Sequence, residues 1–357
     1  MPRAAPSHTI HTWRTYIRTF NLCLLGFGNV NRTLVRLLSE KSAELRQRHQ
    51  VAWRVTGVAS RRIGWLACPD GIEFTPDGGC PPHTSSISNL RDWLTLAQAD
   101  VLFEATSLNV ADGQPAIDHI RTALELGLHA ITANKGPVVF AHEELRRLAS
   151  DRGKHFYFES TVMDGVPIFS LFARTLPTVR LNGFRGILNS TTNVILTGME
   201  EGLSFDASLR RAQQVGVAET DATADIEGWD AAVKIAALAN VLMGARLRPA
   251  DVDRNGIQNL SAAEVRTARA AGLPYKLVCR AQRTGAGVTA SVRPEQLPLT
   301  DPLALVSGTS SIIQFETDIF PNLTITEENP GLYATAYGML ADFVRAVTDP
   351  PSDVRDK

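Results

Sequence analysis

The sequence predicts an α/β fold made of two parts, a mainly parallel sheet followed by an α+β region. From residue 21 to about residue 155, short apolar runs alternate with helical periodicity, which is typical of a parallel sheet with right-handed crossovers. After residue 156 the pattern changes to strand-like runs at 156–158 and 179–184, interleaved with Ala-rich helical stretches such as 231–243. The segment 331–347 has the pattern of one amphipathic helix.

The elements of the first part follow one another in a regular order. Four strands are expected, at residues 21–25, 51–59, 101–104 and 129–132. A helix over 31–48 follows the first strand, and a helix over 115–126 ends at Gly127. The stretch 71–88 is rich in Pro, Gly and Ser, so we expect a surface loop there.

Composition and charge exclude several classes of protein. The 357 residues are 44% hydrophobic and 20% charged, which is ordinary for a globular chain. The net charge of -1 gives no bulk attraction to nucleic acid or to an anionic membrane, and no apolar run approaches the ~18 residues of a membrane span. The four cysteines, Cys23, Cys68, Cys80 and Cys279, form no C-x-x-C pair and fit a reducing cytoplasm. We therefore expect a cytoplasmic protein that acts on a small molecule.

The first twenty residues differ from the rest of the chain. They carry Arg3, Arg14 and Arg18 and no acidic residue, which loosely resembles a transit peptide. Because this signature is only compositional, we expect residues 1–20 to form an N-terminal tail before the first strand.

A glycine turn follows the first predicted strand, with the sequence Gly26-Phe27-Gly28-Asn29-Val30-Asn31. Glycines at this place allow a tight turn and a close approach of the backbone to a pyrophosphate, which the N-terminus of the next helix also attracts. A purely structural turn can carry the same two glycines, and Asn31 stands where a third glycine is usual. The strand before the turn and the helix after it favour a Rossmann-type dinucleotide-binding domain.

The residues after the second strand indicate which dinucleotide is bound. An acidic residue there would bind the ribose hydroxyls of NAD, but the sequence is Ser60-Arg61-Arg62. Arg61 and Arg62 suit the 2'-phosphate of NADP, so we expect NADP, with NAD as a possible second cofactor. The alternative is that both arginines are ordinary solvated surface charges.

Lysine is rare in this chain, and each of the six deserves inspection. They are Lys41, Lys135, Lys154, Lys234, Lys276 and Lys357. Lys234 lies one helical turn after Asp230 in an otherwise apolar helix, and Glu219 and Asp225 precede that helix. Carboxylates can hold the ammonium of an amino-acid substrate, and a lysine can pass a proton to a carbonyl during hydride transfer. The alternative is a plain helical ion pair.

Lys135 directly follows a predicted strand of the first part. Ligands of such sheets bind at the carboxyl ends of the strands, so Lys135 could reach the nicotinamide or the substrate. The alternative is a lysine in a structural turn.

From about residue 21 to about residue 343 the chain resembles homoserine dehydrogenase. The matching segments are residues 26–31, 132–135, 159–167, 186–193 and 218–234. The last segment is the most specific, because the spacing of its carboxylates and of Lys234 agrees with the family pattern.

The resemblance implies reversible NAD(P)-dependent reduction of L-aspartate 4-semialdehyde to L-homoserine, the branch step toward threonine and methionine. Lys234 would be the catalytic lysine and Lys135 a second essential one. The substrate-binding residues implied are Glu219, Asp225, Asp230 and Thr191.

The resemblance also implies a cofactor site, a cation and an assembly. Thr106 and Ser107 would line the nicotinamide side, and Gly331 would return to the cofactor from the C-terminal segment. A monovalent cation, usually sodium, would be bound by the main-chain carbonyls of Glu159, Val162, Asp164 and Val166. The assembly implied is a homodimer.

The same resemblance gives domain limits. We expect a tail at 1–20, the NAD(P)-binding domain at 21–155, a catalytic and dimerisation domain at 156–325, and a C-terminal helix at 326–350 that packs on the first domain. A regulatory domain that binds threonine is not expected, so we expect no feedback through one.

Two departures from the family pattern leave alternatives open. Met163-Asp164-Gly165 replaces a more glycine-rich stretch, and Ser190 replaces a glycine in the substrate loop. Both put bulk near the expected substrate, so a related dehydrogenase for another small amino-acid-like substrate stays an alternative. A non-catalytic dinucleotide-binding homologue is a further one, against which the intact lysines and carboxylates argue.

Overall fold

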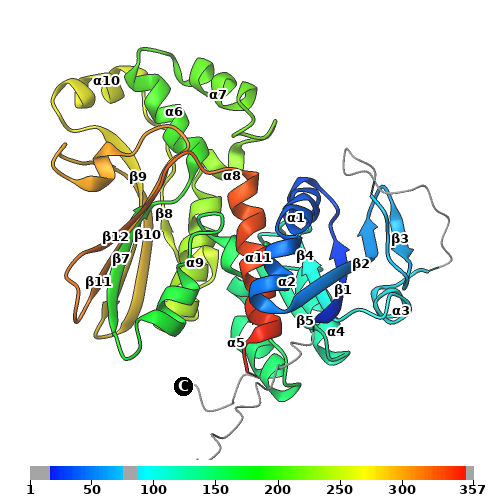
Figure 1. Cartoon of the computed structure of the whole chain (residues 1–357). Coiled ribbons are helices and arrows are strands. Elements are labelled where there is room, and N and C mark those ends of the chain that lie inside the picture. Colours follow the sequence, from blue (N-terminus) through cyan, green and yellow to red (C-terminus); the bar gives the residue numbers. More distant parts are fainter. Residues whose placement is uncertain (1–16, 75–86, 351–357) are drawn as a thin grey trace, which may run out of the picture.

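The computed structural model describes residues 17–74 and 87–350, which form two six-stranded sheets lying side by side (Figure 1). The first sheet has the order β3-β2-β1-β4-β5-β6, and only β3 runs antiparallel to its neighbour. Its strands are β1 (Arg18–Leu25), β2 (Val51–Ser60), β3 (Gly64–Ala67), β4 (Val101–Glu104), β5 (His129–Thr132) and β6 (Phe156–Tyr157). The predicted Rossmann-type α/β fold is confirmed.

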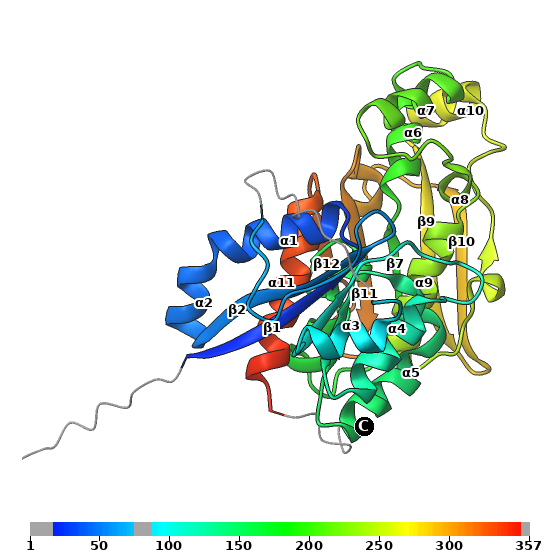
Figure 2. The same ribbon diagram turned by 90° about the vertical axis from the view of Figure 1, so that its right-hand side faces the viewer.

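Helices cover both faces of the first sheet, as Figure 2 shows. These helices are α1 (Asn29–Glu40), α2 (Ser42–His49), α3 (Leu90–Leu96), α4 (Ala116–Glu125) and α5 (Lys135–Asp151). Alternate strand residues enter different cores, because successive side chains of a strand point to opposite faces. Leu22 and Leu24 join the core under α1, whereas Cys23 and Leu25 join the core under α3, α4 and α5.

Several element limits differ from the predicted ones. β1 starts at Arg18, where it pairs with Val51 of β2, although the sequence assigned residues up to 20 to a tail; residues 1–16 lie outside the described part. The helix expected over 31–48 is divided at Lys41 into α1 and α2. The short β6, which the sequence assigned to the second part, pairs with β5 and belongs to the first sheet. Backbone pairing decides these limits, and apolar patterns do not reveal it.

The second sheet has the order β12-β11-β7-β9-β10-β8, and all of its neighbours are antiparallel except β10 and β8. Its strands are β7 (Leu181–Ile187), β8 (Asp253–Arg254), β9 (Tyr275–Thr284), β10 (Gly287–Gln296), β11 (Ser311–Thr317) and β12 (Leu323–Glu327). Its helices are α6 (Ser190–Glu200), α7 (Phe205–Gln214), α8 (Thr223–Ile226), α9 (Trp229–Met243) and α10 (Ala262–Ala270). Short helical turns complete this part at Glu159–Thr161, Leu171–Thr175, Pro249–Asp251 and Pro302–Leu305.

Two helix contacts join the halves of the molecule. α9 packs against β9 and β10 on one side and against α5 of the first half on the other, where the Asn240 side chain donates to the carbonyl of Val139 at 3.1 Å. The last helix, α11 (Leu332–Thr348), leaves the second sheet and packs along α1 (Figure 1). Phe343 of α11 contacts the rings of Phe20 and Phe103. The expected return of the C-terminal helix to the first part is confirmed.

Other expectations concern the surface and the thiols. Within the described ranges, no helix is both long and apolar enough to cross a membrane. Cys23, Cys68 and Cys279 are free thiols, and Cys80 lies outside those ranges. Only the ends of the expected loop 71–88 are described, because residues 75–86 fall outside as well.

Candidate active site

The glycine turn lies at the carboxyl end of β1, where the strand order of the first sheet reverses between β1 and β4. Gly26 has a φ of +78°, and a Cβ atom there would lie 2.4 Å from the carbonyl oxygen of Ala105, which follows β4. The amides of Gly26 and Phe27 both donate to the carbonyl of Ala59 at the end of β2. Only glycine fits the first position, and the turn is held where dinucleotides bind in open α/β sheets.

The start of α1 has no cap among the described residues. Gly28 is its N-cap, no described side chain bonds to the first turn, and no described heavy atom lies within 4 Å of a Cβ built at Gly28. Asn29 and Val30 form the first turn, whose amides are therefore available to a pyrophosphate. Phe27 turns away from this space into the core and stacks on Phe74.

Asn31, which replaces the third glycine, supports the turn. Its side chain is fully buried and donates to the carbonyls of Leu25 at 3.0 Å and Gly26 at 3.1 Å. The asparagine thus connects α1 to the end of β1 through hydrogen bonds, where a glycine would allow close packing.

The loop after β4 lies beside the glycine turn, since a Cβ at Gly26 would meet the main chain of Ala105 and Thr106. The fully buried Glu104 accepts hydrogen bonds from the Thr106 amide at 2.9 Å and the Thr132 hydroxyl at 2.7 Å. Asn134 donates to the carbonyls of Thr106 at 3.1 Å and Ser107 at 3.3 Å. The structure therefore holds Thr106 and Ser107 beside the first turn of α5. Glu104 and Asn134 had no predicted role, although both stand at strand ends.

The arginines expected to recognise a 2'-phosphate lie in the turn between β2 and β3. Arg61 and Arg62 are exposed, and the Ser60 hydroxyl accepts from the amide of Ile63 at 3.1 Å. Because Ala59 holds the glycine turn, these residues lie at the same edge of the sheet as the turn.

Two lysines meet at one carboxylate where the halves of the molecule join. Lys234 on α9 has its Nζ 2.8 Å from Asp230 Oδ2, and Lys135 at the start of α5 has its Nζ 3.3 Å from Asp230 Oδ1. Lys234 also donates to the carbonyl of Leu188 at 2.7 Å. The structure thus brings Lys135 to a pair on α9 that is distant from it in sequence, and Asp230 bridges both lysines.

Asn189, the N-cap of α6, completes the cluster. Its amide donates to Asp225 at 2.6 Å and to Asp230 at 3.0 Å, while its carbonyl oxygen accepts from the Thr192 amide. Thr191 is buried beside it, and its hydroxyl donates to the carbonyl of Val217 at 3.2 Å. Sequence reasoning gave Asn189 no role and predicted no helix after it; the preference of asparagine for N-caps is the signal that could have found it.

The electrostatics of the cluster favour a charged lysine. Burial acts to raise the pKa of Asp230, but the charges of Lys234 and Lys135 and the hydrogen bonds outweigh it and hold the pKa below its usual range. Burial acts to lower the pKa of Lys234, but Asp230, Asp225 and Asp164 outweigh it and raise the pKa. Burial and the neighbouring Asp230 raise the pKa of Asp225. At neutral pH Lys234 is therefore protonated.

Two predicted site residues lie away from this cluster. Glu219 is exposed between α7 and α8, and within the described ranges its carboxylate has no ion pair with the two lysines. Gly331 is the N-cap of α11, and the hydroxyl of Tyr333 bonds to Glu40 at the C-terminal end of α1. Contacts of Glu219 with substrate and of Gly331 with cofactor stay predictions.

The segment 159–166 carries the predicted cation ligands. Among the described residues, no hydrogen bond ends on the carbonyl oxygens of Val162 and Asp164, whereas that of Val166 accepts from the Ile168 amide at 2.8 Å. Met163 and Asp164 both have a φ of +52°, which favours glycine. The Asp164 carboxylate accepts from the Thr335 hydroxyl of α11 at 2.6 Å, and this bond offsets part of the strain.

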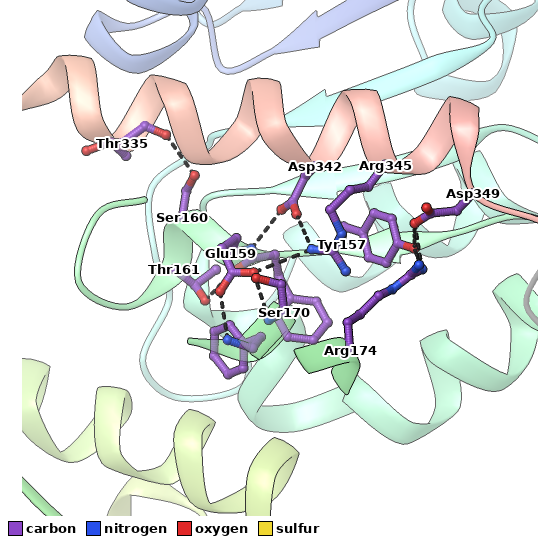
Figure 3. A network of polar contacts seen from close by, with 12 residues as sticks. Tyr157, Glu159, Ser160, Thr161, Ser170, Arg174, Thr335, Asp342, Arg345 and Asp349 are labelled. Carbon is purple, nitrogen blue, oxygen red and sulfur yellow. Dashed lines mark hydrogen bonds and ion pairs between the residues drawn. The ribbon is translucent and has the colours of Figure 1, made fainter. Parts of the chain in front are cut away.

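Polar contacts hold the segment against α11 (Figure 3). The Glu159 carboxylate accepts from the amides of Phe169 at 2.7 Å and Ser170 at 2.9 Å, and its own amide donates to Asp342 at 2.7 Å. Arg345 pairs with both carboxylates, at 3.4 Å from Glu159 and 3.1 Å from Asp342. Burial and the charge of Glu159 raise the pKa of Asp342 to about 8. The Glu159 side chain is thus structural, and only its carbonyl is left for a cation.

A Rossmann-type sheet with a glycine turn at its switch point, next to a lysine–carboxylate cluster, defines a nicotinamide-dependent oxidoreductase. Comparison with known proteins identifies the family. Residues 26–159 match the homoserine dehydrogenase NAD-binding domain, and residues 167–344 match the family model described as homoserine dehydrogenase.

Individual relatives agree with this assignment. The NAD(+)-dependent homoserine dehydrogenase of Pseudomonas canavaninivorans is 35% identical over 335 residues, which are 91% of this chain and 95% of the relative. The homoserine dehydrogenase of Methanocaldococcus jannaschii is 32% identical and is covered to 97%, with 91% of this chain aligned. The crystal structure of a homoserine dehydrogenase from Thiobacillus denitrificans superposes with a TM-score of 0.80 at 28% identity, covering 93% of this chain and 74% of that one. The chain belongs to the homoserine dehydrogenase family.

The family assignment gives the reaction. The enzyme interconverts L-aspartate 4-semialdehyde and L-homoserine with a nicotinamide dinucleotide. The expectation from the sequence is confirmed, and no comparison supports a different substrate or a non-catalytic homologue.

Proposed function

We propose that Lys234 donates a proton to the aldehyde oxygen of L-aspartate 4-semialdehyde and that Asp230 keeps this lysine charged and oriented. The observation that carries the proposal is the position of Asp230 between Lys234 at 2.8 Å and Lys135 at 3.3 Å, one from each half of the molecule. A bound nicotinamide would supply the hydride to the carbonyl carbon. In the reverse direction, a neutral Lys234 takes the hydroxyl proton of homoserine.

The remaining polar residues of the cluster would bind the amino-acid part of the substrate. The Asp225 carboxylate accepts a hydrogen bond from the Asn189 side-chain amide at 2.6 Å and has no ion pair among the described residues, so it can bind the substrate ammonium. We propose Thr191 beside it as a second contact. Glu219 would reach the ammonium from its loop when substrate is bound.

The proposal is tested by oxidation of L-homoserine in a Lys234→Ala variant. Turnover should fall by about 10²-fold or more, because general acid–base catalysis contributes that much, while cofactor binding persists. Lys41→Ala is the matched control, since the Lys41 side chain is exposed and pairs only with Glu44 among the described residues. Full activity of the Lys234 variant would disprove the mechanism.

We propose NADP as the preferred cofactor, with NAD as a second one. Arg61 and Arg62 are exposed at the carboxyl end of β2 and can bind a 2'-phosphate by charge-assisted hydrogen bonds. The name of the Pseudomonas relative specifies NAD(+), so the preference needs a direct test. The double replacement of Arg61 and Arg62 by Ala should raise KM for NADP at least 10-fold and leave KM for NAD unchanged. An unchanged ratio of the two KM values would refute the preference.

We propose that the carbonyls of Glu159, Val162, Asp164 and Val166 bind sodium or another monovalent cation. Among the residues that the structure describes, the main-chain oxygens of Val162 and Asp164 accept no hydrogen bond, which supports this proposal, since such oxygens suit hard cations. Sodium chloride should raise the melting temperature above that in choline chloride at equal ionic strength. Equal melting temperatures would contradict a specific site.

We propose a homodimer in which the outer face of the second sheet is the interface. α9 covers the face of Cys279 and Ala281, whereas the opposite face carries Val278 and the turn Pro302–Leu305. Leu305 on that turn is 67% exposed. A Leu305→Asp variant should sediment as a monomer if this face associates, and an unchanged dimer would reject the interface.

The low cysteine content supports a cytoplasmic location, which cell fractionation would test.

A further inference from the structure

Lys276 is a buried lysine outside the lysine–carboxylate cluster. It lies on β9 and is only 2% exposed. Its Nζ donates to Asn193 Oδ1 at 3.2 Å and to the carbonyl of Val306 at 2.7 Å. An ammonium group is costly to bury, so a lysine at this place must contribute contacts that an apolar residue cannot make.

The charge of Lys276 is balanced from the same helix that it contacts. Burial lowers the pKa of Lys276, and the carboxylate of Glu200 acts in the opposite direction. Glu200 lies on α6, seven residues after Asn193, and therefore on the same face of that helix. Arg269 of α10 approaches Glu200 to 3.8 Å. Lys276 thus donates a hydrogen bond to Asn193 of α6 and lies near the opposite charge of Glu200 on the same helix.

Asn193 connects Lys276 to the loop 306–310 through hydrogen bonds. Its side-chain amide donates to the carbonyl of Gly308 at 3.0 Å. The hydroxyl of Ser190 donates to the carbonyl of Thr309 at 2.9 Å. Lys276 itself holds the start of the same loop through Val306. The ammonium therefore fixes the first turn of α6 relative to this loop and to β9.

The same turn of α6 faces the active site on its other side. The carbonyl of Leu188 accepts from Lys234 at 2.7 Å, and the Asn189 amide holds Asp230 at 3.0 Å. Leu188 and Asn193 are only five positions apart in the chain. A displacement at Asn193 must therefore move the acceptor that positions Lys234.

We propose that Lys276 is a positioning residue for the reaction: it fixes segment 188–193 from behind, so that Leu188 and Asn189 hold Lys234 and Asp230 in line with the substrate. This inference rests on the proposed role of Lys234 and extends it. It also explains why the Ser190 side chain is accommodated, since its hydroxyl joins the loop that Lys276 holds.

The experiment compares Lys276→Met with Val278→Ala. Methionine keeps the unbranched shape and removes every donor. Val278 lies two residues further along β9 on the same face and is fully buried, so its truncation destabilises the same region and leaves the hydrogen bonds to α6 in place. We expect kcat for L-homoserine oxidation to fall 10- to 100-fold in Lys276→Met and to stay within about 2-fold in Val278→Ala, with unchanged cofactor affinity in both.

A second variant separates positioning from stability. Lys276→Met removes the buried positive charge near Glu200 and leaves Arg269 at 3.8 Å, so Lys276→Met with Glu200→Gln should recover part of the lost melting temperature while kcat stays low. This double variant also serves if the single one does not fold. Recovery of kcat together with stability, or an unchanged kcat in a folded Lys276→Met protein, would overturn the proposal. Full activity of Lys234→Ala would instead refute the proposed function, so the two failures are distinct.

Discussion

Replacement of Asp230 by Asn tests the central feature of the site. Asparagine keeps the shape of the side chain and its hydrogen bond to Asn189 but removes the charge between Lys135 and Lys234. Two ammonium groups would then face each other with no carboxylate between them. Both stability and turnover should fall, because the same charge orients the lysines and compensates them.

The magnitude follows from the distances. At an effective dielectric constant of about 20, unit charges at 2.8 Å and 3.3 Å attract by about 6 and about 5 kcal/mol. Desolvation offsets much of this attraction when the pair forms. Removing one partner of a largely buried pair leaves the other uncompensated, and the measured cost is about 3–5 kcal/mol. We expect that loss in the free energy of unfolding, together with a fall in kcat of about 10²-fold or more.

Asp225→Asn is the matched control for stability. Asp225 contacts the same Asn189 amide but pairs with no lysine among the described residues, so its replacement should cost about 1 kcal/mol or less. Urea unfolding followed by tryptophan fluorescence measures both variants. If Asp230→Asn were no less stable than Asp225→Asn, the charge of Asp230 would not hold the two lysines.

Three further predictions concern pH and backbone fit. Because the folded pKa of Asp230 is depressed, its contribution to stability is present above the unfolded pKa of about 4 and is lost as pH falls. The difference in unfolding free energy between the parent and Asp230→Asn should therefore shrink by about 1.4 kcal/mol per pH unit below pH 4. A constant difference would contradict this prediction. Gly26→Ala should destabilise the fold by about 2 kcal/mol through backbone strain at φ +78°. Gly28→Ala should leave the melting temperature unchanged and weaken cofactor binding, measured by calorimetry, at least 10-fold. Equal losses of stability in the two variants would reject this distinction. In Gly338→Ala the new Cβ would lie 2.4 Å from the Ser160 hydroxyl, so α11 must shift and the melting temperature should fall by several degrees. An unchanged melting temperature would show that the Ser160 side chain moves aside without cost.

Residue patterns within short stretches of sequence predicted most of the first half of the fold. The strands β4 and β5 begin and end where 101–104 and 129–132 were predicted, because strands buried on both faces carry short, mostly apolar runs. The glycine turn was also readable, since its conformation depends on neighbouring residues. β3 had no such signal, and the run 156–158 was predicted as a strand but assigned to the second part. Both β3 and β6 are short edge strands, and their places are decided by pairing with β2 and β5.

The lysines and carboxylates of the cluster could be named from spacing, but their arrangement could not. Asp230 and Lys234 stand one helical turn apart, so their ion pair follows from helix geometry alone. The contact of Asp230 with Lys135 spans 95 residues of sequence and depends on the packing of α5 against α9. Glu219 shows the opposite case, because its place in the motif did not bring its carboxylate to the lysines.

The sequence by itself determined the class of fold, the place of the glycine turn and the residue types of the proposed active site, since these depend on periodicity and on residues close together in the chain. Tertiary structure decided which groups meet. It gave Asn31 a hydrogen-bonding role, assigned Glu159 to a network with α11, and buried Lys276 behind segment 188–193. Contacts of this kind join distant segments, and their free energy depends on burial and orientation, which arise only when the sheets and helices pack.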